Sequence, residues 1–258
     1  MYFNNLHILW FVLIAFIGLL VGKFVSYADE KFVKEEKIFT KSIIKEFIKN
    51  YDFNYFIMIF IAAMYIFLLY KFGIKDEFLK NLDLIKYLIL TPMLVSAFFV
   101  DCKHRIIPNR LNMTIFETGI ILTVVYGYNN INVAKDMLLG MLVGAGIFAI
   151  ITVLGGIIAG KEAMGLGDVK FMGAIGLFFG ASNIAQISLL AFFVAAICSI
   201  VILIVRIFIL KKKDEYIAFG PFLVIAAIAC IFLPADSIWQ TFMIVCNGVS
   251  DIILKPFI

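Results

Sequence analysis

Residues 136–159 read DMLLGMLVGAGIFAIITVLGGIIA, a stretch of 24 residues in which the first carries the single charge. A bilayer core about 30 Å thick is crossed by a helix of about 20 mostly apolar residues. Inside lipid the backbone N–H and C=O groups find no water, so they have to be paired within the segment itself. The stretch is therefore predicted to be a transmembrane helix.

Runs of the same kind recur along the chain, which has 258 residues, 64% hydrophobic side chains and a mean hydropathy of +1.06. A typical soluble domain has roughly 45–50% apolar residues. We therefore predict an all-α polytopic membrane protein with about eight transmembrane helices, at residues 6–27, 53–73, 84–100, 111–128, 136–159, 169–180, 184–210 and 217–234. The sixth run is too short to cross a bilayer unaided, so it is expected to be tilted, sheltered or continuous with the preceding loop.

Pairs of glycines four residues apart punctuate several of these runs. This spacing puts both glycines on one helix face, where a neighbouring backbone can approach closely. We expect tight helix contacts at the pairs Gly18/Gly22, Gly140/Gly144 and Gly176/Gly180.

Lysine and arginine are distributed unequally between the two predicted sides of the membrane. One set of loops holds 16 of them and the other 6, among 22 in total. Cytoplasmic loops carry the excess of basic residues. The N-terminus is therefore predicted to lie outside, and the breaks at 101–110 and 160–170 to face the cytoplasm. The net charge of +4 comes from basic residues scattered among these breaks, which does not favour nucleic-acid binding.

Three regions follow from this pattern. Residues 1–83 form a two-span N-terminal region with a basic cytoplasmic segment, 84–236 a membrane domain, and 237–258 an apolar tail. Within the first region, the stretch 28–52 combines apolar residues on one helical face with lysines at four-residue intervals. It is interpreted either as an amphipathic helix on lipid or as a solvated linker.

Two aspartates occupy an unusual setting. Asp101 closes the third span in VSAFFVDCKHRIIPNR, and Asp168 lies in GLGDVK at the start of the sixth. Both are predicted on the cytoplasmic side at the same depth. Two carboxyls that approach each other do not both ionise cheaply, so the pair would share a proton and offer a base beside an acid. The alternative is that both are ordinary solvated residues at the membrane border.

The neighbouring residues suit such a pair. Gly165 and Gly167 allow backbone conformations that other residues avoid and let a substrate chain come close. Pro108 restricts the residue before it, so IIPN is predicted to form a turn that starts the fourth span near Asn109.

Other chemistries are less well supported. The chain has two histidines, His7 and His104, on opposite predicted sides, and no CxxC pair, so no metal site is predicted. A transporter or channel component that binds protons or cations at its carboxylates remains the main alternative. It would favour acidic residues at mid-span, whereas both aspartates lie at span ends.

DCKHRIIPN at 101–109 resembles the first motif of the type IV prepilin peptidases, GKEAMGLGDVK at 160–170 is similar to their GxGD motif, and FGPFL at 219–223 resembles a third segment. The resemblance implies that Asp101 and Asp168 are catalytic. It also implies that Glu162, Lys170 and the two glycines at 165 and 167 support the loop and the approach of substrate.

What this resemblance implies is a membrane aspartic endopeptidase of the bacterial cytoplasmic membrane, whose partners are lipid and a prepilin or pseudopilin. It would remove the basic leader at the cytoplasmic face without a cofactor. The bifunctional members also methylate the new N-terminus and carry paired CxxC motifs in a larger first cytoplasmic domain. This chain has no cysteine before Cys102. Methyltransferase activity is therefore not expected, and S-adenosylmethionine would be needed only if that activity is present.

Overall fold

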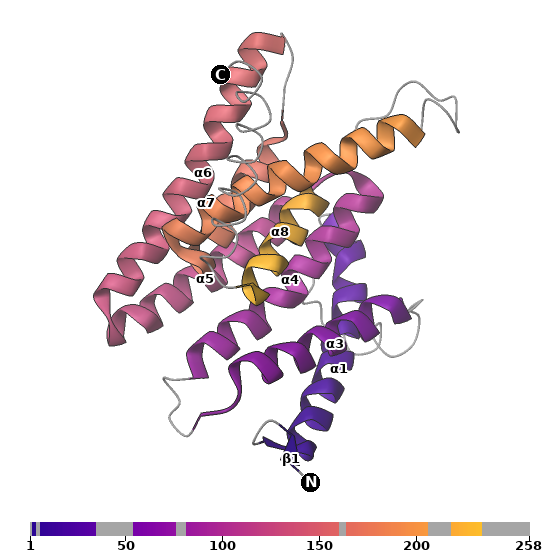
Figure 1. Ribbon diagram of the computed structural model, residues 1–258, viewed down its shortest axis with the longest axis vertical. Helices are drawn as coiled ribbons and strands as arrows, with labels where there is room; N and C mark the ends of the chain where they lie inside the picture. The colour runs from indigo at the N-terminus through magenta and orange to yellow at the C-terminus, as the bar shows by residue number, and fades with distance from the viewer. Residues whose placement is uncertain are drawn as a thin grey trace, which may run out of the picture.

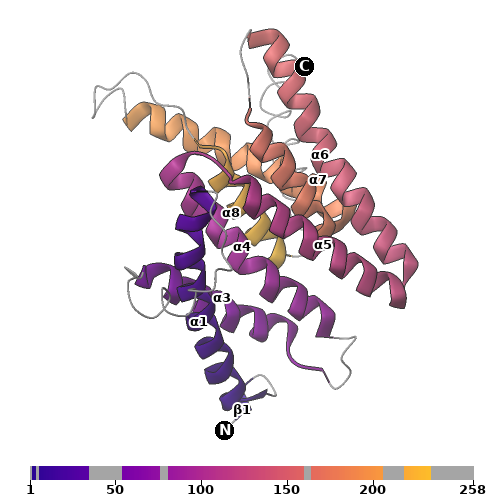
Figure 2. The ribbon, with the colours of Figure 1, turned by 180° about the vertical axis from the view of Figure 1, so that it is seen from behind.

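The computed structural model describes residues 2–3, 6–34, 54–75, 81–159, 164–205 and 218–233, and within them the protein is a bundle of helices (Figure 1). The helices are α1 (Ile8–Val33), α3 (Tyr55–Phe72), α4 (Leu82–His104), α5 (Asn109–Asn129), α6 (Ile131–Ala159), α7 (Leu166–Val205) and α8 (Gly220–Phe232). Two short strands, β1 (Tyr2–Phe3) and β2 (Leu6–His7), pair antiparallel before α1. Figures 1 and 2 show α1 and α3 at one end of the bundle and α6 at the other.

Six of the described helices are long and apolar enough to cross a membrane, namely α1, α3, α4, α5, α6 and α7. The shorter α8 is apolar as well. The predicted all-α polytopic architecture is therefore confirmed. Which side the N-terminus faces stays a prediction.

The predicted sixth and seventh spans both lie in helix α7, which is broken at Gly180. Gly180 has φ 78° and ψ 173°, in a region that favours glycine, so the chain changes direction there. All residues from 171 to 180 are buried. The short sixth segment is thus sheltered by its neighbours, one of the arrangements expected from its length.

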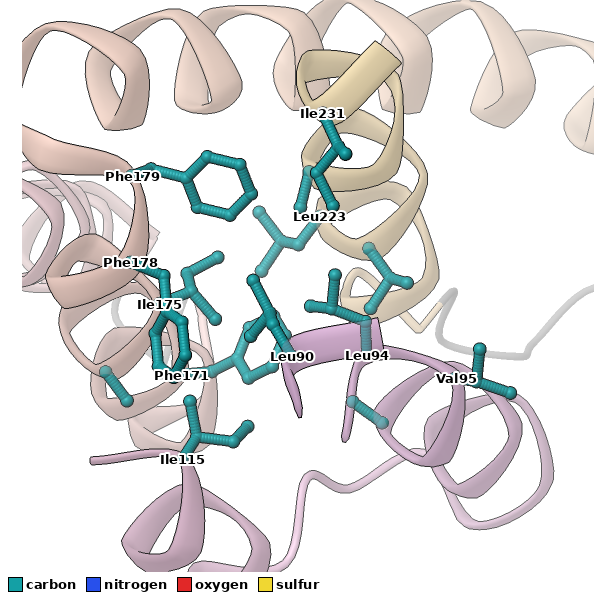
Figure 3. Packing of buried hydrophobic residues seen from close by; sticks show 14 of the residues in the cluster. Leu90, Leu94, Val95, Ile115, Phe171, Ile175, Phe178, Phe179, Leu223 and Ile231 are labelled. Carbon is teal, nitrogen blue, oxygen red and sulfur yellow. The ribbon is translucent and has the colours of Figure 1, made fainter. Parts of the chain in front are cut away.

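The core lies where this sheltered half of α7 meets α4, α5 and α8 (Figure 3). Apolar side chains from the four helices interdigitate there, and they include Leu90, Leu94, Ile115, Phe171, Ile175, Phe178 and Leu223. Burial on every side explains why this stretch of α7 shows no polar face. The core also holds the start of α7 in place beside the end of α4.

Close glycine contacts join the helix pairs as expected. A Cβ added to Gly140 of α6 would collide with the backbone carbonyl of Gly176 on α7. At the other end of the bundle, a Cβ on Gly18 would lie 2.7 Å from the Cα of Ala62 in α3. Both helix pairs therefore touch through their backbones.

A proline in α4 is accommodated by a neighbouring tyrosine. Pro92 lacks the amide that would bond to the carbonyl of Leu88, four residues earlier. The hydroxyl of Tyr65 on α3 donates to that carbonyl at 2.7 Å. Membrane helices tolerate proline where a neighbour satisfies the freed backbone group in this way.

Two further polar contacts fasten the N-terminal helices to the rest. The Nζ of Lys71 on α3 donates to the carbonyl of Ile231 near the end of α8 at 2.5 Å. The hydroxyl of Ser96 on α4 donates to the carboxyl of Asp29 on α1. The two N-terminal helices are thus fastened to α4 and α8 by polar as well as apolar contacts.

Several helix boundaries differ from the prediction by a few residues. The first span was expected to end at residue 27, but α1 continues to Val33 because a helix does not have to end where the lipid does. The third was expected to end at 100, but α4 continues to His104. Most of the basic segment predicted at 28–52 and all of the tail at 237–258 lie outside the described residues.

Candidate active site

Asp101 lies in the last turns of α4 and is only 4% exposed. The helix ends at Arg105, which adopts a left-handed conformation with φ 58° and donates its backbone N–H to the Asp101 carbonyl at 2.8 Å. This tight ending turns the chain toward α5. The alternative of a solvated Asp101 at the membrane border is therefore wrong.

The carboxyl of Asp101 faces the N-terminus of α8. Its environment includes a hydrogen bond with the backbone amide of Gly220, whereas its Oδ2 has no partner among the described residues. A Cβ on Gly220 would lie 2.5 Å from that oxygen. Helix N-termini attract negative charge, so the segment FGPFL supplies a favourable backbone surface for this carboxylate.

The turn after α4 packs against the loop that carries the second aspartate. Pro108 is the N-cap of α5, with φ −61° and ψ 138°, and α5 begins at Asn109 as the sequence predicted. Ile107 and Pro108 are buried. A Cβ on Gly167 would lie 3.4 Å from the carbonyl oxygen of Ile107, so these two backbones lie close together.

Asp168 lies in the first turn of α7 and is partly buried. Its backbone N–H donates to the carbonyl of Gly165 at 3.0 Å, which closes the turn around Leu166 and Gly167. The charge of Asp101 acts on this carboxyl. The fold therefore brings together two aspartates that are separated by 66 residues of sequence.

Both aspartates line one cavity of about 840 Å³, here called the aspartate cavity. Its wall also includes Arg105, Lys170 and Phe219. The cavity thus combines two carboxyls, two cations and two aromatic rings, those of Phe192 and Phe219, with room for a polypeptide segment and water.

Two hydrogen bonds tie α5 to the loop of Asp168. The Nζ of Lys170 donates to Oδ1 of Asn109 at 2.9 Å, and Nδ2 of Asn112 donates to the carbonyl of Gly167 at 3.1 Å. Lys170 and Asn109 were both predicted to support the site. The sequence analysis did not predict a role for Asn112. An asparagine within a predicted apolar span, three residues after Asn109, is nevertheless a signal for a side chain that anchors a neighbouring backbone.

Of the predicted supporting residues, Glu162 falls outside the described residues. Cys102 and His104 are exposed and line a different cavity, between α1, α3 and α4. Among the described residues, no group of three or more His, Cys, Asp or Glu side chains is placed to hold a metal ion.

Comparison with known proteins identifies the family. The model of the type IV leader peptidase family matches residues 88–204, which include both aspartates. The leader peptidase HopD of Escherichia coli is 32% identical over 132 residues, covering 51% of this chain and 82% of HopD. The chain belongs to the type IV leader peptidase family.

Longer members of the type IV leader peptidase family match as well. The type 4 prepilin-like proteins leader peptide-processing enzyme of Escherichia coli O78:H11 is 28% identical over 148 residues, 57% of this chain and 51% of that protein. The prepilin leader peptidase/N-methyltransferase of Aeromonas salmonicida is 29% identical over 156 residues, 60% and 51% of the two chains. The chain thus matches about half the length of these longer relatives. No solved structure matches it significantly.

Proposed function

We propose that this member of the family is an aspartic endopeptidase that removes the leader peptide from type IV prepilins or pseudopilins. The observation that carries the proposal is that Asp101 and Asp168, from separate motifs, line the same cavity. Membership in a peptidase family favours hydrolysis over the transporter alternative. The names of the relatives supply the substrate class.

The chemistry of the proposal needs only water and the two carboxyls. The ionised carboxylate takes a proton from water as the water oxygen attacks the scissile carbonyl carbon, while the protonated carboxyl donates to the carbonyl oxygen. Collapse of the tetrahedral intermediate breaks the C–N bond, as the protonated carboxyl donates to the leaving nitrogen and the carboxylate takes back a hydroxyl proton of the intermediate. The products are a leader with a new carboxyl terminus and a mature protein with a new amino terminus.

The remaining residues of the site support this reaction. In this proposal the backbone amide of Gly220, at the α8 N-terminus, partly offsets the cost of burying a charge on Asp101. The glycines 165 and 167 leave space for a substrate backbone at Asp168. In this proposal Lys170 positions the loop through its bond to Asn109. No metal or organic cofactor enters the reaction.

The charge asymmetry supports the sidedness of the proposal. Both motifs adjoin the predicted side that carries 16 of the 22 lysines and arginines, which favours cleavage at the cytoplasmic face of the bacterial cytoplasmic membrane. The N-terminus would then lie outside. Periplasmic and cytoplasmic labelling of single cysteines introduced at residues 74 and 106 would test this orientation.

We propose a peptidase without methyltransferase activity. HopD, of which the chain covers 82%, is named as a leader peptidase alone, whereas the relatives named peptidase/N-methyltransferase are matched over about half their length. The N-terminal third also has no cysteine for the paired motifs. S-adenosylmethionine would be required only if mass spectrometry of the mature substrate showed a methylated N-terminus.

The test of the peptidase is cleavage of a co-expressed candidate prepilin by the full chain. Asp101→Asn and Asp168→Asn are compared with wild type at equal membrane abundance, since each substitution keeps the shape of the side chain and removes its acid–base chemistry. We expect both variants to leave the prepilin uncleaved. Normal cleavage by either variant would disprove the aspartate pair.

A further inference from the structure

A second, smaller hollow adjoins the aspartate cavity, and no feature of the reaction described above uses it. It has a volume of about 470 Å³ and lies between α5, α6 and the first half of α7. Its lining is mostly apolar and includes Met113, Phe116, Met141, Ala145 and Val169. We call it the α5–α6 groove.

One residue that lines this groove has a polar atom without a hydrogen-bond partner among the described residues. Asn112 lines the groove and is 4% exposed. The Gly167 carbonyl accepts a hydrogen bond from the NH₂ group of the Asn112 side chain. Because only this group of the amide can donate, Oδ1 of Asn112 points away from Gly167. Oδ1 is buried without a hydrogen-bond partner among the described residues. A buried acceptor left unpaired costs about 1–3 kcal/mol, so the site is suited to a ligand that brings an N–H.

The groove and the aspartate cavity share part of their walls. Asn109 and Lys170, joined by a hydrogen bond of 2.9 Å, line both of them. The outer edge of the groove is open, because Met113 is 61% and Phe116 40% exposed. Both residues lie on a helix that is apolar enough to span a membrane. The groove therefore extends from an exposed face of α5 to the wall of the aspartate cavity.

We propose that the mature part of the substrate begins with an apolar helix directly after the scissile bond, and that the α5–α6 groove receives the first turns of this helix. The proposal rests on the function proposed above and assigns a place to one part of that substrate. The first four N–H groups of any helix have no partner within the helix. One of them would donate to Oδ1 of Asn112, while apolar side chains fill the rest of the groove. The leader would then extend from the scissile bond into the aspartate cavity.

Cross-linking between single cysteines tests this placement. In a full-length variant with Cys102, Cys198, Cys230 and Cys246 replaced by serine, Met113→Cys or Phe116→Cys is combined with Asp168→Asn. Prepilins with one cysteine at successive positions along the first turns of the mature helix are reconstituted with it in liposomes and oxidised. The matched controls are Ile121→Cys and Val124→Cys, which are 62% and 69% exposed farther along the same helix.

We expect disulfide yields at least about tenfold higher at 113 and 116 than at 121 and 124, because proximity sets the rate of cross-linking. The yield should also recur at substrate positions three and four residues apart, as one helix face requires. Equal yields at all four positions, or no cross-link at 113 and 116, would overturn the groove assignment. The latter result would indicate that lipid occupies the groove.

The possible results distinguish a failure of the groove proposal from a failure of the proposed peptidase mechanism. The substrate cysteine lies on the mature side of the bond, so a cross-link forms whether or not the leader is removed. Cleavage that depends on both aspartates, without cross-links at 113 and 116, would reject the groove alone. Cross-links at 113 and 116 together with aspartate-independent cleavage would reject the aspartate mechanism alone.

Discussion

A side chain on Gly220 would place its Cβ 2.5 Å from Oδ2 of Asp101, so these two residues fit together only because position 220 carries no side chain. Gly220→Ala is therefore expected to displace the carboxyl. Gly220 begins α8 without a positive φ, so alanine does not strain the backbone there. We expect prepilin cleavage to fall roughly 10- to 100-fold, since small misplacements of catalytic groups have effects of this size.

The matched control for this substitution is Gly146→Ala in α6, where a Cβ would meet nothing within 4 Å. It should retain full cleavage. Rates are measured with equal amounts of folded protein, quantified by size-exclusion chromatography in detergent. Full activity of Gly220→Ala would show that the Asp101 carboxyl does not need its observed position.

Asn112→Leu removes the hydrogen bond that holds the Gly167 carbonyl. The loop before Asp168 should then open more often, because a buried anchor is lost. We expect faster amide hydrogen exchange in the peptide covering residues 164–170 and slower prepilin cleavage. Thr114→Val is the control on the same helix, because the Thr114 hydroxyl bonds to the Arg110 carbonyl within α5. Unchanged exchange at 164–170 in Asn112→Leu would contradict an anchoring role.

Tyr65→Phe leaves the Leu88 carbonyl without its donor. A buried acceptor that loses its partner costs about 1–3 kcal/mol, so the unfolding temperature in detergent should fall. Tyr128→Phe, at a side chain that is 96% exposed, should change nothing. In a Pro92→Ala background the amide at position 92 can supply the bond itself. The cost of Tyr65→Phe should therefore shrink there, and an equal cost in both backgrounds would refute this account.

Asp136 caps the second half of α7 from a neighbouring helix. Its Oδ1 accepts from the backbone N–H of Ala181 at 3.3 Å, directly after the break at Gly180. Asp136→Ala should destabilise the protein by about 1 kcal/mol, as the loss of an N-cap does, and Asp136→Asn should cost much less because it keeps an acceptor. The unfolding temperatures of the two variants provide the comparison, and equal losses would exclude capping.

Gly180→Ala should be more damaging than either Asp136 variant. It combines a positive φ with a Cβ that would collide with the Asp136 carboxyl. We expect poor yields of folded protein in detergent, and Asp136→Ala in the same chain should restore part of the yield by removing the collision. No restoration would mean that the backbone strain alone dominates.

The sequence predicted the helices and the aspartate pair because both leave local traces. Apolar runs of sufficient length predict the spans. The distribution of lysine and arginine among the loops predicts that Asp101 and Asp168 lie on the same side of the membrane. The ends of the spans were less predictable. Asp29, Glu30 and Lys31 interrupt the apolar pattern of α1, yet the helix continues through them, with Asp29 accepting a bond from Ser96.

Contacts between distant segments left no such trace. The segment FGPFL resembles part of the family, but its sequence alone does not predict that Gly220 contacts Asp101. Likewise, the Tyr65 hydroxyl reaches the Leu88 carbonyl only because α3 packs against α4. Polarity patterns show which residues are buried, whereas the choice of partner depends on how whole helices are packed.

The glycine contact between α6 and α7 constrains how the two carboxyls can approach each other. Because Gly140 meets the backbone of Gly176 directly, with no side chain between them to yield, the sheltered half of α7 has little freedom to slide along α6. A motion that carried Asp168 toward Asp101 would therefore move α6 and α7 as one unit, or would come from α4. We therefore expect the separation of the two carboxyls to change through movement of packed helices rather than through closure of a loop alone.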